Sequence, residues 1–202
     1  MLKSLIQRVG AGRLRVAIGI ATCAALAAVY PLADGFADDV SVPIELQVDL
    51  LARVTKFERT FGLKGTTPAK VVVVSKAGST ASTRASAQLM TALARAASFA
   101  GRPLTTVRHA FSNPETLKRA ATGAAIVYLT PGLSAEMKSI AASLSGLQIL
   151  VVASSNGDVQ RGAVLGFELE SARPRIVVNL SQARAQKLDF NSQLLRLAKV
   201  IQ

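Results

Sequence analysis

The chain carries few of the side chains that enzymes use for nucleophilic or metal chemistry. Cys23 is its only cysteine and His109 its only histidine. A Ser-His-Asp hydrolase would have to use His109, which lies in the strand-like run VRHAF, and no GxSxG motif is present. We interpret His109 as structural, and one histidine is too few for a typical transition-metal site. The sequence also lacks a P-loop and a GxGxxG motif. It therefore predicts no catalytic residues, no metal and no cofactor.

The segment SKAGSTAST, residues 75–83, is the best candidate for binding a small ligand. It follows a β-branched run and opens a helix, which is where open α/β sheets bind ligands. Backbone N–H groups and hydroxyls could face an anion there, with a lysine beside them. The candidate ligand-binding residues are Ser75, Lys76, Ser79 and Thr80. The alternative is that these residues form a Ser/Thr-rich turn that only caps the helix.

Two carboxylates, Glu168 and Glu170, raise the question of acid–base catalysis. They lie in a segment that reads as a β-hairpin with Ser171-Ala172 at its tip. The expected cross-strand pairs are Phe167 with Ile176 and Leu165 with Val178 on one face, and Glu168 with Arg175 and Glu170 with Arg173 on the other. Each carboxylate then has an arginine opposite, so we interpret this face as solvated and charge-paired. Ser-Ala is not a preferred turn, and Pro174 suits an edge strand.

The polar end of this hairpin is less well explained by packing. Asn179 ends the run RIVVN, and SQAR follows at once. Asn179 can satisfy backbone groups at the strand end, and Ser181 can cap the next turn of helix. Contact with a ligand is the alternative role for these residues.

Strand-like and helical patterns alternate along the first three quarters of the chain. The β-branched run at residues 70–74 predicts a buried strand, and residues 104–111, 124–130 and 147–153 predict three further strands. Helical spacing lies before and between them. The expected helix starts are Pro43, Asn113-Pro114 and Ser134. This alternation predicts a single α/β domain, with a largely parallel sheet flanked by helices. The hairpin and a terminal helix over residues 188–202, capped by Asn191, complete the prediction.

Residues 1–37 have the pattern of an export signal. A basic lead precedes an apolar stretch from Val16 to Ala33, and Gly35-Phe36-Ala37 offers small residues for cleavage before Asp38. An uncleaved anchor is one alternative, because the stretch is just long enough to span a bilayer. Lipid modification of Cys23 is another, but Thr22 stands where a smaller residue is needed. We expect cleavage, which leaves residues 38–202 as one periplasmic domain without cysteine, so it must be held by core packing alone.

The chain is strongly basic, with a net charge of +12. An exported protein meets no nucleic acid routinely, so we exclude nucleic acid as a partner. Anionic lipid, an acidic partner protein and a small anionic ligand remain as partners for a basic surface. A homodimer is a separate alternative. A basic surface that is merely well solvated is the alternative.

The C-terminal third resembles the YfiR-like family of periplasmic regulatory proteins. The resemblance lies in the order RGAVLGFEL, a charged turn, PRIVVNLSQAR and QLLRLAKV, and also in IELQVDLLARVTKFERTF before VVVV. The positions that match the family pattern are Gly162, Phe167, Asn179, Ala183, Arg184, Leu188 and Leu195. The candidate partner-binding or family-motif residues are Arg161, Gly162, Phe167, Asn179, Ser181 and Arg184.

The resemblance implies a periplasmic α/β protein without catalytic activity. The best-understood members bind an inner-membrane diguanylate cyclase and hold it inactive, which limits cyclic di-GMP and biofilm formation. Members with that role often carry redox-active cysteines, whereas residues 38–202 have none. Thiol-based sensing is thereby excluded, and the cyclase partner becomes less certain. The alternative functions are a periplasmic protein that binds an anionic solute for an envelope transporter and a passive envelope component. Solute-binding proteins are usually two-lobed, and one compact domain counts against that class.

Overall fold

The computed structural model describes residues 42–63 and 66–202 of the chain. The predicted signal peptide, residues 1–37, lies outside the described residues. Within the described ranges, no helix is both long and apolar enough to cross a membrane.

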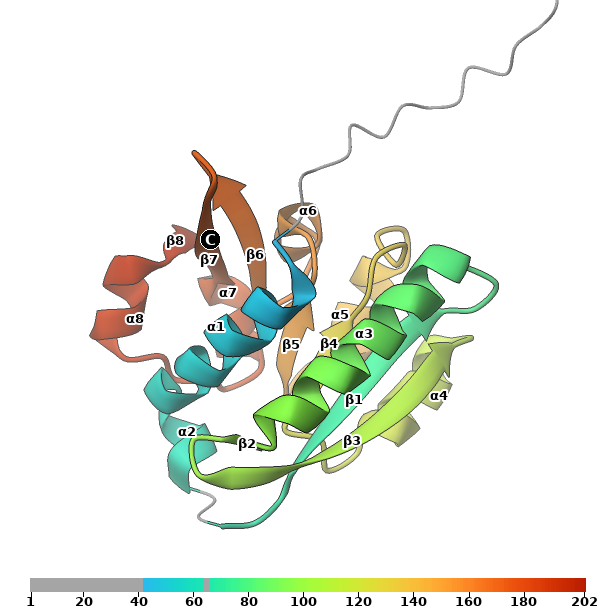
Figure 1. Ribbon diagram of the computed structural model, residues 1–202, viewed down its shortest axis with the longest axis horizontal. Coiled ribbons are helices and arrows are strands. Elements are labelled where there is room, and N and C mark those ends of the chain that lie inside the picture. Colours follow the sequence, from blue (N-terminus) through green and yellow to red (C-terminus); the bar gives the residue numbers. More distant parts are fainter. Residues whose placement is uncertain (1–41, 64–65) are drawn as a thin grey trace, which may run out of the picture. The chain divides into compact units, whose positions relative to one another are not determined.

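One mostly parallel sheet organises the described part of the chain (Figure 1). Its eight strands follow the order β2-β3-β1-β4-β5-β6-β7-β8. Neighbouring strands from β3 to β6 are parallel, β2–β3 and β6–β7 are antiparallel, and β7–β8 is parallel. The strands are β1 (Ala69–Lys76), β2 (Ser98–Phe99), β3 (Arg102–Phe111), β4 (Ile126–Leu129), β5 (Leu150–Ala153), β6 (Leu165–Glu170), β7 (Arg173–Asn179) and β8 (Lys199–Ile201). The predicted α/β domain with a largely parallel sheet is therefore confirmed.

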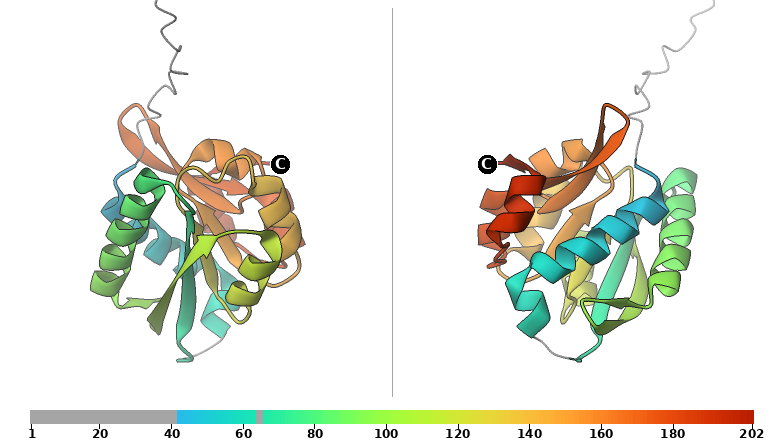
Figure 2. Two further views of the ribbon diagram at one scale, coloured as in Figure 1. Left: turned by 90° about the vertical axis from the view of Figure 1, so that its right-hand side faces the viewer. Right: turned by 60° about the vertical axis from the view of Figure 1, so that its left-hand side comes forward.

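Helices cover both faces of this sheet (Figures 1 and 2). Two long helices, α1 (Ile44–Phe57) and α3 (Thr80–Ala96), pack together on one face. The other face carries α4 (Pro114–Ala121) and α5 (Met137–Leu144), with α7 (Leu180–Ala185) beside α5. The remaining helices are α2 (Arg59–Leu63), α6 (Asn156–Gln160) and α8 (Ser192–Leu197).

The centre of the sheet is buried because its strands are covered from both sides. Val71 to Val74 of β1 are all fully buried, as are the four residues of β4 and the four of β5. A strand between two helical layers has no polar face, which explains the continuous apolar runs in the sequence. The core is accordingly built mainly from valine, leucine, isoleucine and alanine.

The hairpin has the predicted register. Leu165 pairs with Val178, Phe167 with Ile176, Glu168 with Arg175, and Glu170 with Arg173. The two tip residues, Ser171 and Ala172, have φ angles of 50° and 61°. A two-residue hairpin turn that matches the twist of the strands needs positive φ at both positions, which glycine and asparagine usually supply. Here Ser171 and Ala172 adopt these angles instead.

The predicted terminal helix over residues 188–202 is wrong at both ends, since α8 begins only at Ser192. Helix α8 stops at Leu197, and residues 199–201 form β8, which pairs with β7. The physical reason is that the edge of β7 offers unpaired backbone groups, and β-branched Val200 and Ile201 suit a strand better than a helix. Asn191 does cap α8, as expected, because its side chain accepts a hydrogen bond from the N–H of Leu194 at 3.0 Å.

The other predicted helix starts were partly correct. Asn113 caps α4, with Pro114 in the first position. Pro43 is the N-cap of α1 and so lies directly before its first turn. Ser134 does not cap α5, which begins at Met137 after Glu136. The reason is a turn closed by the N–H of Glu136 on the carbonyl of Leu133, which delays the helix.

A buried carboxylate joins the first helices to the C-terminal part of the chain. Glu58 is 3% exposed and follows α1. Its side chain accepts hydrogen bonds from the N–H groups of Thr60, Phe61 and Asp189. The backbone adds a bridge between Glu58 and Phe190, and a bond from the N–H of Asn191 to the carbonyl of Phe57. One side chain thus caps α2 and also holds a segment that is distant in sequence.

We expect the substitution Glu58→Ala to lower the free energy of unfolding by about 2 kcal/mol, because one buried and two partly buried N–H groups would lose their acceptor. Urea unfolding followed by circular dichroism would measure this. The matched control is Glu45→Ala, which removes an exposed carboxylate from the first turn of α1. Equal stability of the two variants would show that the Glu58 carboxylate does not hold these segments together.

Candidate functional site

The four predicted ligand-binding residues lie together at the carboxyl end of β1, but their side chains are largely engaged. Ser75 and Lys76 end the strand, and Ser75 is buried. Ser79 caps α3 by accepting a hydrogen bond from the N–H of Ser82 at 3.2 Å, and Thr80 is the first residue of that helix. The Lys76 ammonium lies 3.3 Å from a carboxylate oxygen of Glu136. Its charge is therefore offset, which weakens the case for an anion at this point.

An open hollow lies at the start of α3. Its lining comprises Gly78, Ser79, Thr80, Thr83, Arg84 and Ala87. Only Ser79 and Thr80 of the four predicted residues contribute to it. Arg84, which the sequence analysis did not single out, supplies the positive charge in place of Lys76. An anion bound here would contact Arg84 and the first turn of the helix.

The switch point of the sheet lies between β1 and β4, because the chain runs first to β3 on one side and then to β4 on the other. Hydroxyl groups occupy this position. Ser82 Oγ lies 2.6 Å from Thr130 Oγ1, which in turn donates to the carbonyl of Val74 at 2.9 Å. Ligands of open α/β sheets usually bind at such a point. In this protein the hydroxyl groups of Ser82 and Thr130 occupy that point and form a hydrogen bond with each other.

A cavity of about 190 Å³ lies next to this switch point, between α1, α3 and the ends of β4 and β5. Its polar lining includes Gln47, Tyr128 and Ser154. The sequence analysis missed these residues because they come from three segments far apart in the chain and share no spacing. The only available signal was that Thr130 and Ser154 directly follow buried strands.

Three of the family-motif residues are buried and structural. Asn179 caps α7: its Oδ1 accepts from the N–H of Gln182 at 3.1 Å, and its Nδ2 donates to the carbonyl of Val159 at 3.0 Å. Phe167 is buried in the core. Gly162 has a φ of 133°, and a Cβ on it would lie 2.7 Å from the Cβ of Ala141 in α5. The predicted satisfaction of backbone groups by Asn179 is thus confirmed.

The other three motif residues lie at the surface. Ser181 does not cap the helix as predicted, since its hydroxyl donates to Asn179 Oδ1 at 2.7 Å and Asn179 makes the cap. Arg161 is half-exposed, 3.6 Å from the carboxylate of Asp158. Arg184 is exposed on α7. The family-motif residues are therefore of two kinds. Three are buried and hold the local structure, and three are exposed at the end of α6 and on α7.

A shallow hollow between α5 and α7 adjoins this motif surface. Its lining comprises Lys138, Ala141, Ala142, Ser145, Arg161, Gly162, Gln182 and Ala185. Small residues form most of it, and two basic residues, Lys138 and Arg161, lie at its border. We call this hollow the α5–α7 groove. Its composition suits a protruding side chain of a partner better than a buried small molecule.

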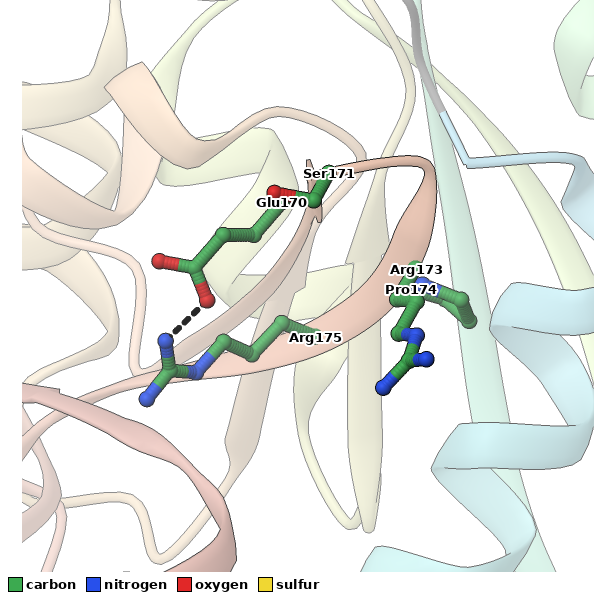
Figure 3. Close-up of a pocket in the computed structure, with 5 residues that line it drawn as sticks. All are labelled: Glu170, Ser171, Arg173, Pro174 and Arg175. Atoms are coloured by element: carbon green, nitrogen blue, oxygen red, sulfur yellow. Dashed lines mark hydrogen bonds and ion pairs between the residues drawn. The ribbon is translucent and has the colours of Figure 1, made fainter.

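The hairpin tip presents a second exposed basic feature (Figure 3). Arg175 pairs with Glu170 across the hairpin, diagonal to the register partner Arg173. Glu168 binds Lys199 of β8 at 3.0 Å and Asn156 of α6 at 2.7 Å. Both carboxylates thus have structural partners, although not the arginines that the register alone indicated. Arg173 points away from the ion pair (Figure 3).

His109 gives no sign of a catalytic role. It lies on β3, opposite Val74 of β1, and is half-buried. Burial lowers the pKa of its imidazole below the ordinary value, which favours the neutral form. Its Nε2 is buried and has no hydrogen-bond partner among the described residues, so a structural role for His109 stays a prediction.

A mostly parallel sheet flanked by helices places the domain in the α/β class, and similar solved structures share this fold. A conserved domain protein from Vibrio cholerae matches with a TM-score of 0.59 and 13% identity, over 81% of this chain and 61% of that one. The ABC domain in complex with L-Trp from Streptococcus pneumonia matches at 0.59 and 11%, over 79% and 60%. The ligand-free, open structure of CD0873, a substrate binding protein with adhesive properties from Clostridium difficile, matches at 0.55 and 14%, over 80% and 60%. At these identities the likeness shows the fold alone, and the chain spans about three fifths of each protein's length.

The family follows from the sequence itself. Residues 45–199 match the family model described as YfiR/HmsC-like, so the chain belongs to the YfiR/HmsC-like family. This confirms the resemblance noted in the sequence. The family is periplasmic, regulatory and non-enzymatic, and it acts through a protein partner. No curated protein matches the chain.

Proposed function

We propose that this chain is an exported, non-catalytic periplasmic regulator that binds and restrains an inner-membrane diguanylate cyclase, and so limits cyclic di-GMP and biofilm formation. The observation that carries the proposal is the family match over residues 45–199, which spans nearly all of the described fold. A regulator of this kind needs a rigid domain with an exposed contact surface rather than a catalytic centre.

The α5–α7 groove and the adjacent motif residues are the contact surface that we assign to the partner. Buried Asn179 fixes the start of α7, and Gly162 allows α5 to approach closely. Arg161, directly after α6, and Arg184, in α7, are exposed next to these buried residues. Arginine is enriched among residues that dominate binding energy at protein interfaces, because its planar guanidinium forms several directed hydrogen bonds. Basic residues here favour an acidic surface on the cyclase.

Binding of an anionic solute for a transporter is the second candidate function. One similar structure is that of a substrate binding protein, and another is a complex with L-Trp. The hollow at the start of α3, with Arg84, is where such an anion would bind. The ion pair between Lys76 and Glu136 counts against it, as does the chain's span of about three fifths of those proteins.

Cyclic di-GMP measured in a deletion strain and its parent tests the proposed function. We expect a clear rise in the deletion strain and a return to the parental level when the exported protein is supplied. Unchanged cyclic di-GMP, both at rest and under envelope stress, would reject restraint of a cyclase and favour the transporter function.

The substitution Arg184→Ala tests the contact surface in the same strain. We expect about a tenfold loss of affinity for the partner and a raised cyclic di-GMP level, with export and folding unchanged. The matched control is Arg95→Ala, which removes an exposed arginine from α3 on the opposite face of the sheet. A destabilised Arg184→Ala protein that binds its partner normally per folded molecule would contradict this assignment, as would equal effects of the two variants.

A further inference from the structure

The cavity between α1, α3 and the ends of β4 and β5 has the features of a small binding site. Its volume is about 190 Å³, and it lies at the carboxyl edge of the parallel strands. Its lining comprises Ile44, Gln47, Ala85, Gln88, Leu89, Tyr128, Thr130, Pro131 and Ser154. This is the edge of an open α/β sheet at which ligands bind.

One buried hydroxyl of this lining has no partner. Ser154 is 7% exposed, and its Oγ makes no hydrogen bond within the part of the chain that the structure describes. The next residue, Ser155, provides the cap of α6, so Ser154 is not needed for that role. Buried polar groups nearly always have a partner, and an orphaned hydroxyl in a cavity wall points to a group that enters the cavity.

Three of the other polar groups of the lining are held in place by the protein, while the fourth, Gln88, is exposed. The Tyr128 hydroxyl donates to Gln47 Oε1, and Gln47 Nε2 donates to the carbonyl of Val42 at 2.6 Å. Thr130 Oγ1 is bound to Val74 and Ser82. These side chains are therefore fixed, and the wall is ordered before any ligand arrives. Tyr128 retains acceptor capacity on its oxygen.

The lining carries no charge. None of the described residues that line the cavity is acidic, basic or a histidine. Burial raises the pKa of the Tyr128 hydroxyl, so this group stays protonated and neutral at physiological pH. A charged ligand would lose its hydration and gain no opposite charge, which is costly. The cavity thus selects for an uncharged ligand.

The volume limits the size of that ligand. An apolar protein cavity of about 150 Å³ is large enough to bind benzene. This cavity is slightly larger, and Ile44, Leu89 and Pro131 give it apolar walls. It can hold one ring, or an aliphatic skeleton of that size, with a single polar substituent directed at Ser154.

We propose that this cavity is a binding site for a small uncharged molecule that has an apolar body and one hydroxyl or amide group bound by Ser154. The site differs from the anion-binding hollow at the start of α3 in position and in charge. The inference does not depend on the identity of the partner protein.

Four related probes test the proposal: benzyl alcohol, benzoate, benzylamine and toluene. Each is titrated into the exported protein, and backbone amide shifts are followed by NMR. We expect benzyl alcohol to bind saturably in the millimolar range or tighter, with the largest shifts at Gln47, Leu89 and Ser154. Benzoate and benzylamine, which are charged at neutral pH, should bind at least about tenfold more weakly.

Two variants locate the site. Ser154→Ala should weaken benzyl alcohol about three- to tenfold and leave toluene unchanged, because only the alcohol uses the hydroxyl. Ala85→Leu should fill the cavity and abolish binding of both. Its control is Ala87→Leu, an exposed position of α3 outside the cavity lining. Absence of saturable shifts, tighter binding of benzoate than of benzyl alcohol, or unchanged binding by Ala85→Leu would each overturn the proposal.

Discussion

The substitution Arg102→Ala should lower the free energy of unfolding by about 4 kcal/mol and the melting temperature by roughly 10 °C. Arg102 is 3% exposed at the start of β3. Its guanidinium donates to the carbonyls of Thr67 at 2.8 Å and Pro68 at 3.3 Å, and lies 4.6 Å from the centre of the Phe61 ring. Removing it would leave these partly buried carbonyls without their donors and a void beside an aromatic ring.

The setting of Arg102 makes this effect large. No carboxylate lies within ion-pair distance of it among the described residues. Backbone carbonyls and an aromatic ring surround its charge. The planar guanidinium of arginine can donate to several carbonyls while it lies over the ring, and the ammonium of lysine cannot do both. Arg102→Lys should therefore recover only part of the loss.

Arg108→Ala is the matched control, because it removes an exposed arginine from the same strand and should change stability by less than about 0.5 kcal/mol. Thermal unfolding and urea unfolding measure all three variants. If Arg102→Lys recovered full stability, the positive charge alone, rather than the planar geometry of the guanidinium, would account for the stabilising effect of Arg102.

The substitution Gly162→Ala should lower the free energy of unfolding by about 3 kcal/mol and should also weaken partner binding. Two costs combine at this position. A φ of 133° is unfavourable for any residue with a Cβ, and the added Cβ would lie 2.7 Å from that of Ala141. The neighbour belongs to a packed helix, so α5 would have to move away from the segment between α6 and β6 that contains Gly162.

Gly146→Ala separates the two costs. Gly146 has a φ of 77°, but a Cβ on it would meet no atom within 4 Å. Its substitution should cost about 1 kcal/mol from backbone strain alone, and partner binding should be unaffected. Urea unfolding and partner affinity are measured for both variants. Similar losses for Gly146→Ala and Gly162→Ala would show that contact with α5 is not the reason for glycine at position 162.

Local patterns in the sequence were sufficient to predict much of this fold. The β-branched run at residues 70–74 predicted a strand buried on both faces, because only burial in a parallel sheet tolerates four successive valines. The hairpin register followed from matching apolar and charged positions across a two-residue tip. Asn113 and Asn191 could be identified as caps because capping is local: each side chain accepts a hydrogen bond from an N–H group only three residues further along the chain.

Features that depend on distant segments were not predicted. Strand β8 exists because β7 has an open edge, which the sequence of residues 199–201 does not reveal. The sequence around Arg102 does not distinguish it from a surface arginine. Its buried position depends on contacts with Phe61 and Pro68, which are distant in the chain. The cavity is assembled from α1, α3, β4 and the loop after β5, and its key serine lies in an unremarkable SS pair. In each case the missing information was tertiary contact.

The bonds between Glu58 and Asp189 have a consequence for the order of folding. They join positions near the two ends of the domain, so the N-terminal helices reach their final contacts only when almost the entire chain is available. Contacts between segments so far apart in sequence form slowly, because a long loop must be closed first. A chain threaded through a membrane must stay unfolded until its end has passed. If the chain is exported as we propose, an arrangement that delays these contacts to the last residues suits that requirement.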